Sequence, residues 1–213
     1  MTSLEHFRKI PLEKQNRIIN AALSVFGTNG YRKTSGQDIA DAAGISKAML
    51  FYYFGTKKAL YLYLLDLCGK TLMDGVNDKF DPRINDFFER IKLAGDIEME
   101  ILKKRPAIIS FLDSATHESE AAVKADIQAR MASEQAAAFQ RNIAFNGIDM
   151  SKFKQGIDPK LIVKMLLWMS EGYFSDMTSK EHPDLEMFYR DYLNCLELLR
   201  KVCYREDKGD NES

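Results

Sequence analysis

Residues 36–55 read GQDIADAAGISKAMLFYYFG and predict two short helices joined by a tight turn. The apolar side chains of this stretch recur at helical spacing. Ala40 is small where the two helices would cross, and Gly44 can adopt the left-handed backbone that the turn requires. Ser46 is suited to cap the second helix. The pattern therefore predicts a helix-turn-helix, and the alternative is an ordinary helical hairpin.

The second helix of this pair would turn a polar and small-residue face outward. Lys47, Ala48, Met49 and Tyr52 lie on the side opposite its apolar positions. In a helix-turn-helix that binds DNA, this face enters the major groove. We therefore expect these side chains to contact DNA.

The charge distribution agrees with a polyanion-binding head. Residues 1–60 hold nine Lys and Arg against four Asp and Glu, although the net charge of the whole chain is only −1. The remaining 153 residues therefore carry a net charge of −6. A basic head on an acidic body suggests that only the head binds a polyanion, and chance fluctuation is the alternative.

Helical periodicity continues along the rest of the chain, without a sustained strand-like alternation, so the predicted fold class is all-α. The expected helices span 12–29, 36–43, 46–53, a long stretch from 56, and then 81–105, 106–115, 118–145, 159–178 and 184–204. We expect a DNA-binding domain at 1–55, a helical effector-binding and dimerisation domain at 56–205, and a flexible tail at 206–213.

Composition excludes several other classes of protein. The chain has 46% hydrophobic and 29% charged residues, which is typical of a soluble globular protein rather than a disordered or membrane-spanning one. Its N-terminus lacks the basic and apolar regions of a signal peptide. Three cysteines without a Cys-x-x-Cys motif indicate reduced thiols. We therefore expect a cytoplasmic protein with no metal, no cofactor and no membrane partner.

The head also resembles a known family. The resemblance rests on the segments Gly30-Tyr31, Thr34-Ser35, Asp38-Ile39-Ala40, Ala43-Gly44-Ile45-Ser46-Lys47, Leu50-Phe51-Tyr52-Tyr53-Phe54 and Lys57 with Leu60. These segments are similar to the N-terminal signature of TetR-type transcriptional regulators, over about residues 18–64. The resemblance implies a three-helix DNA-binding head, a helical body that binds an effector and dimerises, and repression that a small molecule relieves.

The resemblance also implies which residues contact DNA. They are Thr34, Ser35, Gln37, Ser46, Lys47, Ala48, Met49, Tyr52, Tyr53 and Lys57. Hydroxyl, phenol and ammonium groups suit phosphates, whereas Gln37, Lys47, Ala48 and Met49 occupy base-facing positions. Two positions depart from the family: Phe51 replaces a usual tyrosine, and Lys58 stands where an acid is common.

The predicted effector-binding domain, residues 56–205, is rich in bulky apolar side chains. These side chains could line an adaptable apolar cavity, and for each of them plain core packing is the alternative. The candidates for a ligand pocket are Phe87, Ile108, Phe111, Leu112, Met131, Met165, Trp168, Met169 and Tyr173. The sequence favours a small hydrophobic or amphipathic effector.

The last two helices resemble the dimerising pair of the family. The candidate interface residues are Leu161, Gly172, Leu193, Leu196 and Leu199. A glycine inside a helix costs about 1 kcal/mol relative to alanine, which is easier to understand if another helix passes close to Gly172. A homodimer also matches this mode of DNA binding, because one short helix reads too few bases of double-stranded operator DNA.

Two other functions compete with a ligand-released repressor. A ligand-independent regulator or an activator would have the same head. An enzyme is the other alternative, but the chain has no phosphate-binding glycine loop, nucleophile elbow or zinc motif. The expected function is therefore that of a regulator and not of an enzyme.

Overall fold

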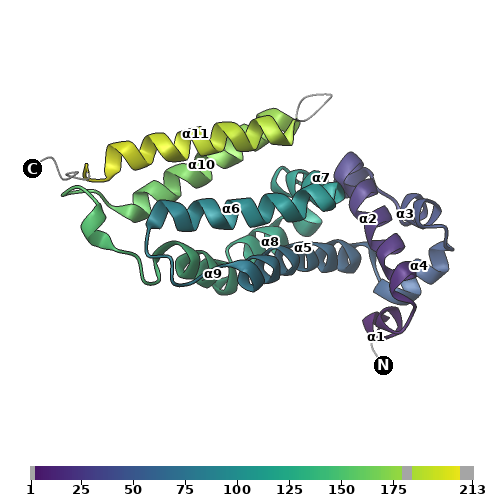
Figure 1. Ribbon diagram of the computed structural model, residues 1–213. Helices are drawn as coiled ribbons and strands as arrows, with labels where there is room; N and C mark the ends of the chain where they lie inside the picture. Colours follow the sequence, from purple (N-terminus) through teal and green to yellow (C-terminus); the bar gives the residue numbers. More distant parts are fainter. Residues whose placement is uncertain (1–2, 179–183, 207–213) are drawn as a thin grey trace, which may run out of the picture. The chain divides into compact units, whose positions relative to one another are not determined.

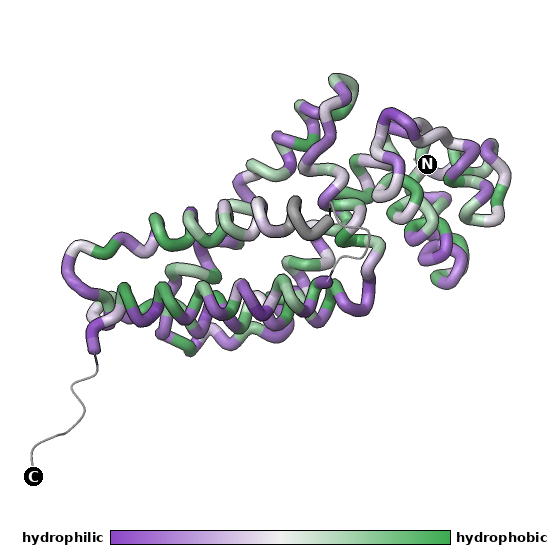
Figure 2. The backbone as a smooth tube through the Cα atoms, turned by 90° about the horizontal axis from the view of Figure 1, so that it is seen from above, coloured by the Kyte–Doolittle hydropathy of each residue, from purple (hydrophilic) through white to green (hydrophobic). Residues whose placement is uncertain are grey.

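The computed structural model of the protein describes residues 3–178 and 184–206. These residues form eleven α-helices and one 3-10 helix, with one isolated bridge between Phe153 and Tyr204 and no strand (Figure 1). The all-α prediction is confirmed. The colouring of Figure 2 alternates between hydrophilic and hydrophobic along most helices, as in amphipathic helices that bury one side.

The chain divides into two compact units. The first comprises residues 1–75 and 100–137, and the second comprises residues 76–99 and those from 138 onward. The helices, in chain order, are α1 (Ser3–Arg8), α2 (Leu12–Lys33), α3 (Gly36–Ala43), α4 (Lys47–Phe54), α5 (Lys57–Lys79), α6 (Phe87–Lys104), α7 (Pro106–Thr116), α8 (Ala121–Met131), α9 (Glu134–Phe145), the 3-10 helix η1 (Met150–Lys152), α10 (Pro159–Thr178) and α11 (Leu185–Cys203).

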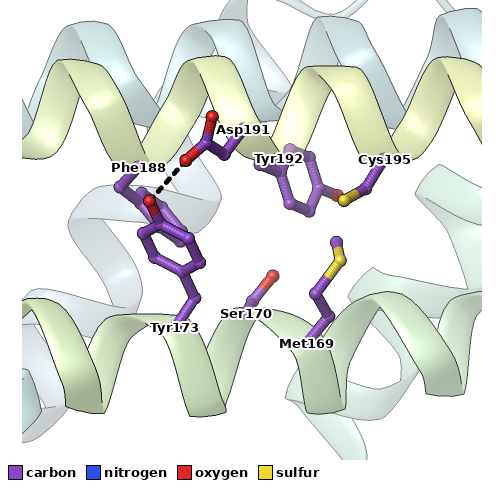
Figure 3. Close-up of a pocket in the computed structure, with 7 residues that line it drawn as sticks. All are labelled: Met169, Ser170, Tyr173, Phe188, Asp191, Tyr192 and Cys195. Atoms are coloured by element: carbon purple, nitrogen blue, oxygen red, sulfur yellow. Dashed lines mark hydrogen bonds between the residues drawn. The ribbon is translucent and has the colours of Figure 1, made fainter.

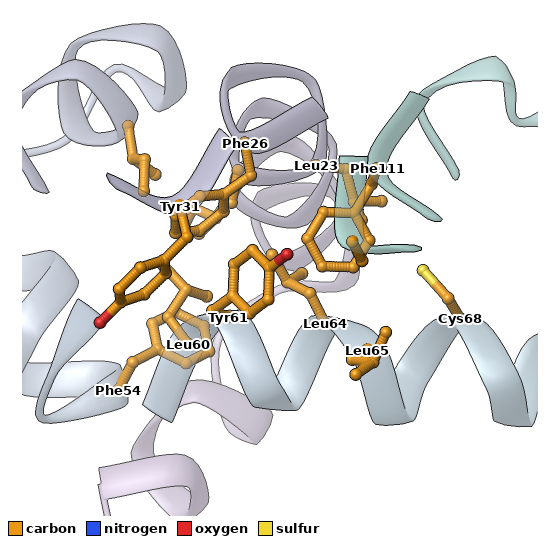
Figure 4. Close-up of a cluster of buried hydrophobic side chains, with 14 of the residues drawn as sticks. Leu23, Phe26, Tyr31, Phe54, Leu60, Tyr61, Leu64, Leu65, Cys68 and Phe111 are labelled. Atoms are coloured by element: carbon orange, nitrogen blue, oxygen red, sulfur yellow. The ribbon is translucent and has the colours of Figure 1, made fainter. Parts of the chain in front are cut away.

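The core of the first unit is built around a fully buried tyrosine of α5. The Tyr61 ring packs edge-on against Phe26 of α2, with 4.9 Å between ring centroids, and against Phe111 of α7, at 5.1 Å (Figure 4). Such aromatic pairs stabilise a fold beyond the burial of their area. This cluster joins the helix that precedes the helix-turn-helix to two helices that follow it.

Helices α2 and α7 also meet at their backbones. A Cβ atom added to Gly27 would lie 2.9 Å from the Phe111 backbone nitrogen and from the Ser110 carbonyl carbon. The Ser114 hydroxyl donates a hydrogen bond of 3.2 Å to the Phe26 carbonyl oxygen. Because only glycine allows such a close approach, Gly27 determines where α7 packs against α2.

The second unit has its own core, in which Phe87, Phe88, Phe153 and Tyr204 pack together. Asp86 caps α6 by accepting hydrogen bonds from the backbone nitrogens of Phe88 and Glu89. Its carboxylate also binds Lys152 at 3.0 Å and Arg200 at 3.3 Å. The Asp86 ion pairs therefore connect the start of α6 to η1 and to α11, which lie far away in the sequence.

The structure corrects two of the predicted helix boundaries and keeps a break at a third. Helix α6 begins at Phe87 rather than at residue 81, because Asp86 provides its cap. The helix expected over 118–145 is two helices, broken at residues 132–133, where the Ser133 hydroxyl accepts from the Ala136 nitrogen. The predicted stop at Gly30 is present as a kink, because the Gly30 backbone is non-helical (φ 71°, ψ 171°), and a further short helical stretch ends at Lys33.

An unpredicted helix, α1, precedes the head. Its Phe7 is fully buried against the rings of Tyr53 and Phe54 in α4 and of Tyr63 in α5. The His6 ring packs on the Tyr52 ring with 4.8 Å between centroids. Helix α1 therefore packs against α4 at the buried Tyr53 and Phe54 and also contacts the exposed Tyr52.

Candidate nucleic-acid interface

Helix α3 starts in a capping box. The Ser35 hydroxyl accepts from the Asp38 backbone nitrogen at 3.2 Å, and the Asp38 carboxylate accepts from the Ser35 nitrogen at 2.8 Å. These hydrogen bonds hold the pKa of Asp38 below its usual value, because they stabilise the charged carboxylate. The cap is exposed, and the Ser35 hydroxyl keeps its own proton for donation to a phosphate.

The turn between α3 and α4 has the geometry that the sequence predicts. Gly44 is left-handed (φ 62°, ψ 43°), and its N–H lies against the carbonyl oxygens of Ala40 and Asp41. Ile45 donates to the Ala40 carbonyl at 3.0 Å. The turn therefore closes α3 without a side-chain cap and directs the chain into α4.

Helix α4 begins at the predicted cap, where the Ser46 hydroxyl accepts from the Met49 nitrogen at 3.1 Å. Leu50, Tyr53 and Phe54 are buried. The exposed residues of the cap and helix are Ser46, Lys47, Ala48, Met49 and Tyr52. The face predicted to enter a major groove is thus the face that the first unit leaves exposed.

Gln37 lies on the exposed side of α3. Its side-chain nitrogen donates to the Asp41 carboxylate at 2.7 Å. This bond orients the amide and leaves its oxygen available to a donor. Gln37 and Lys47 thus present polar groups from the two helices of the pair.

Three residues predicted to bind phosphates, namely Thr34, Tyr53 and Lys57, have side chains that bind partners inside the protein. Thr34 is buried and donates its hydroxyl to the Gly30 carbonyl oxygen at 2.7 Å. The buried Tyr53 donates its phenol to the Met49 sulfur at 3.2 Å. Their contact with DNA remains a prediction, and in this structure both side chains stabilise the head.

Lys57 is the third predicted phosphate contact whose polar group binds partners inside the protein. Its ammonium donates to the carbonyl oxygens of Tyr31 and Thr34, each at 2.9 Å, and lies 4.2 Å from the centre of the Tyr31 ring. A cation at the carbonyl end of a helix is favourable, because the helix dipole is negative there. Lys57 therefore holds the end of α2 against the start of α5.

The predicted pocket residues fall into separate groups within the two units. Ile108 and Phe111 are buried in the core of the first unit, with Leu112 packed against it, and Phe87 is buried in the core of the second. Met131, Met165 and Trp168 are exposed. Neither unit, as far as it is described, brings all nine side chains into one cavity.

Met169 and Tyr173 do line a small cavity, of about 60 Å³, between α10 and α11 (Figure 3). Its other lining residues are Ser170, Phe188, Asp191, Tyr192 and Cys195. The Tyr173 hydroxyl donates to the Asp191 carboxylate at 2.5 Å. The cavity has room for one or two water molecules and is too small for an effector.

The predicted dimer residues also separate. Leu196 is 4% exposed and packs in the core of the second unit, so it does not reach the surface. Leu161, Met165, Trp168 and Gly172 follow one another at helical spacing and are exposed on one face of α10. Leu198 and Val202 are exposed on α11. We call these six residues the apolar stripe.

The described residues contain no group of three or more His, Cys, Asp or Glu side chains that could hold a metal ion. None of their helices is both long and apolar enough to cross a membrane. The three cysteines are free thiols.

This geometry, a capped α3, a left-handed turn and an exposed face on α4, defines a helix-turn-helix protein. The family described as Bacterial regulatory proteins, tetR family, matches residues 18–64. The regulator RutR of Escherichia coli is 44% identical over 52 residues, which are 24% of this chain and 24% of RutR. The matched segment thus spans about a quarter of the length of that relative.

Two solved structures extend the likeness in fold to nearly the whole chain. FadR from Bacillus subtilis, solved with stearoyl-CoA, aligns with a TM-score of 0.68 and 18% identity over 86% of this chain and 96% of FadR. SmeT, the repressor of the Stenotrophomonas maltophilia efflux pump SmeDEF, aligns with 0.69 and 15% over 94% of both chains. The match to the TetR family thus covers residues 18–64, and the two solved structures show a similar fold over most of the chain.

Proposed function

We propose that the protein is a ligand-responsive transcriptional regulator that acts in the cytoplasm as a repressor. It binds a palindromic operator as a homodimer and is released by a small apolar or amphipathic effector. The exposed face of α4, next to a capped α3, is the observation that carries the proposal. Residues 1–55 read the DNA, and residues 56–205 bind the effector and form the dimer.

The exposed side chains divide into base-reading and phosphate-binding groups. Lys47 can donate to O6 and N7 of guanine, whereas Ala48 and Met49 offer apolar contact to a thymine methyl. Gln37 reads a further base with its amide. Ser35, Ser46 and Tyr52 donate hydroxyl protons to phosphates, which position the helix but carry no sequence information.

The DNA-facing surface is stabilised by internal contacts of Thr34, Tyr53 and Lys57. Their polar groups bind carbonyl oxygens and a sulfur atom within the head. The positive charge of Lys57 still contributes to the attraction between the head and the phosphates of DNA, because electrostatic attraction acts over several ångströms. Lys57 therefore acts both as a support and as part of the basic field.

The apolar stripe is the proposed dimer surface. Leu161 is 55% and Trp168 59% exposed, an unusual exposure for large apolar side chains that follow each other along one helix face. Among the described residues, no atom outside Gly172, its two neighbours and the surrounding backbone of α10 lies within 4 Å of the Cβ position of Gly172. The missing side chain leaves space for the close approach of a helix from a second copy.

The proposed release of DNA passes through the contacts between α2 and α7. An effector changes DNA affinity only if it binds the two states of the protein with different affinity. A shift of α7 would move α2 through Gly27, because the two backbones touch there. Such a shift changes the positions of the two recognition helices of the dimer relative to each other.

Fluorescence anisotropy of a labelled duplex from the DNA upstream of its own coding region tests the proposal. The protein should bind this duplex more tightly than a scrambled one, and the logarithm of the affinity should fall linearly with the logarithm of salt concentration. Equal affinity for both duplexes, or binding that does not change with salt, would contradict sequence-specific binding.

A further inference from the structure

A groove of about 580 Å³ lies within the first unit, between the first half of α2, the middle of α5 and the junction of α6 with α7. It is lined by Leu12, Gln15, Asn16, Ile19, Asn20, Leu23, Tyr63, Leu67, Cys68, Thr71, Lys104, Arg105, Pro106, Ala107 and Ile108. This volume is in the range of sites that hold small organic ligands. None of its lining residues belongs to the exposed face of α4 or to the apolar stripe.

One part of the groove is apolar. Its floor includes Leu23 of α2 and Ile108 of α7, which are both almost fully buried. Leu67 is half-buried on α5. Leu12, in the first turn of α2, is 69% exposed, although it is a large apolar residue. An apolar ligand body would cover Leu12 and remove its surface from water.

The charged lining is positive. Lys104 and Arg105 line the groove, and no acidic residue does. The Lys104 ammonium is bound to Glu100 at 2.7 Å. Within the described chain, the Arg105 guanidinium has no hydrogen bond or ion pair. Arg105 therefore remains available for a ligand anion, which a guanidinium binds through two parallel hydrogen bonds.

Neutral donors of the groove are also available. The side-chain amides of Asn16 and Asn20 are exposed and form no hydrogen bond within the described residues. The Gln15 amide, in contrast, is bound to the Ile10 carbonyl oxygen at 2.8 Å. A ligand with oxygen atoms near its head could thus bind amides as well as the guanidinium.

We propose that this groove binds a small amphiphile with one carboxylate and an apolar chain. The carboxylate binds Arg105, and the chain lies along Leu12, Leu23 and Leu67. The absence of acids from the lining selects an anion over a cation. Because α2 carries the helix-turn-helix, occupancy would provide a second control of DNA binding. This consequence rests on the proposed function, whereas binding of the amphiphile does not.

Isothermal titration calorimetry of the full chain with dodecanoate, and separately with dodecanol, tests the chemistry of the groove. Dodecanoate should bind at least tenfold more tightly than dodecanol, because only the carboxylate pairs with Arg105. No binding of dodecanoate, or equal affinity for the two compounds, would overturn the proposal. The assay contains no DNA, so its result is independent of whether the protein regulates transcription.

Matched variants locate the site. Arg105→Gln should weaken dodecanoate binding about tenfold and leave dodecanol binding unchanged. Lys103→Gln removes the same charge two positions earlier, outside the lining, and should change neither. Asn16→Trp should fill the groove and abolish binding, whereas Asn29→Trp, exposed on the same helix but outside the groove, should not.

Thermal unfolding of each variant shows whether it folds. If folded Arg105→Gln and Asn16→Trp bind dodecanoate as the unsubstituted protein does, the ligand occupies another cavity and the proposal is wrong. If both lose binding while the two controls retain it, the groove is the binding site. Operator affinity measured with and without dodecanoate then tests the second control separately.

Discussion

The Tyr31 backbone N–H donates a hydrogen bond of 2.7 Å to the Glu118 carboxylate and so joins the end of α2 to the segment after α7. The second oxygen of the same carboxylate accepts from the backbone nitrogens of Ser119 and Glu120. One side chain therefore links the support of the DNA-binding head to the turn between α7 and α8.

Glu118→Ala should lower the free energy of unfolding by about 1.5 to 3 kcal/mol, because three backbone donors lose a charged acceptor. Glu118→Gln keeps one carbonyl oxygen and should lose less. Urea denaturation followed by circular dichroism measures both values. Equal stability of Glu118→Ala and the unsubstituted protein would show that this contact contributes nothing to the fold.

Lys57→Met should lower stability because the carbonyl oxygens of Tyr31, in α2, and of Thr34, directly after it, lose their cationic donor, at a cost of about 1 to 3 kcal/mol. Lys58→Met is the matched control, because the neighbouring ammonium forms only an exposed ion pair with Asp126. Both variants should bind any DNA sequence more weakly, since each removes one positive charge from the head.

Thermal unfolding distinguishes the two lysines. A clear loss of stability in Lys57→Met alone is the expected result. If Lys57→Met were as stable as Lys58→Met, the role of Lys57 would be that of a phosphate contact and not of a support.

The pH dependence of stability should reveal Glu98 of α6. Burial raises the pKa of its carboxyl to about 7, and its charge in turn helps to raise the pKa values of Tyr189 and Tyr192 in α11. Because the folded state disfavours the carboxylate, this group lowers stability progressively as the pH rises from its unfolded pKa, near 4.5, to about 7.

Glu98→Gln should therefore be more stable than the unsubstituted protein at pH 8, by at most about 3 kcal/mol, and nearly equal to it at about pH 4. Urea denaturation at the two pH values measures the difference. A stability change of the same size at both would show that the carboxyl titrates normally.

Met165→Glu should shift the proposed dimer toward monomer, because it places a charge in the middle of the apolar stripe. Met150→Glu is the matched control, since Met150 is 53% exposed, compared with 45% for Met165, but lies outside α10 and α11. Sedimentation velocity over a range of concentrations measures the effect. Dimerisation that survives Met165→Glu unchanged would place the dimer surface elsewhere.

The sequence predicted best where local signals agree. The span of α3 and the left-handed turn at Gly44 follow from capping, a small residue and a glycine, all within ten positions. The exposed face of α4 follows from its apolar positions alone. These features depend on neighbours in the sequence, so one sequence is enough to predict them.

The sequence predicted less well where distant partners decide. The ion pairs of Asp86 join it to Lys152 and Arg200, and neither lies near it in the chain. Its capping of α6 is local, and the spacing of Asp86 and Glu89 is a start signal that could have revealed it. The partners of Lys57 are backbone carbonyl oxygens, which carry no sequence signal. Helix α1 has only six residues, but the spacing of Leu4, Phe7 and Ile10 is a helical signal that could have revealed it.

Selection of duplexes from a random library, with the full chain and with Lys47→Ala, tests the central claim most directly. The unsubstituted protein should enrich a palindrome whose half-sites lie about 34 to 36 Å apart, or a multiple of one helical turn. Lys47→Ala should enrich the same palindrome with relaxed preference at one symmetric pair of positions, where discrimination falls by about 1 to 3 kcal/mol. Enrichment of no palindrome, or an unchanged preference at every position in Lys47→Ala, would contradict base reading by the exposed face of α4.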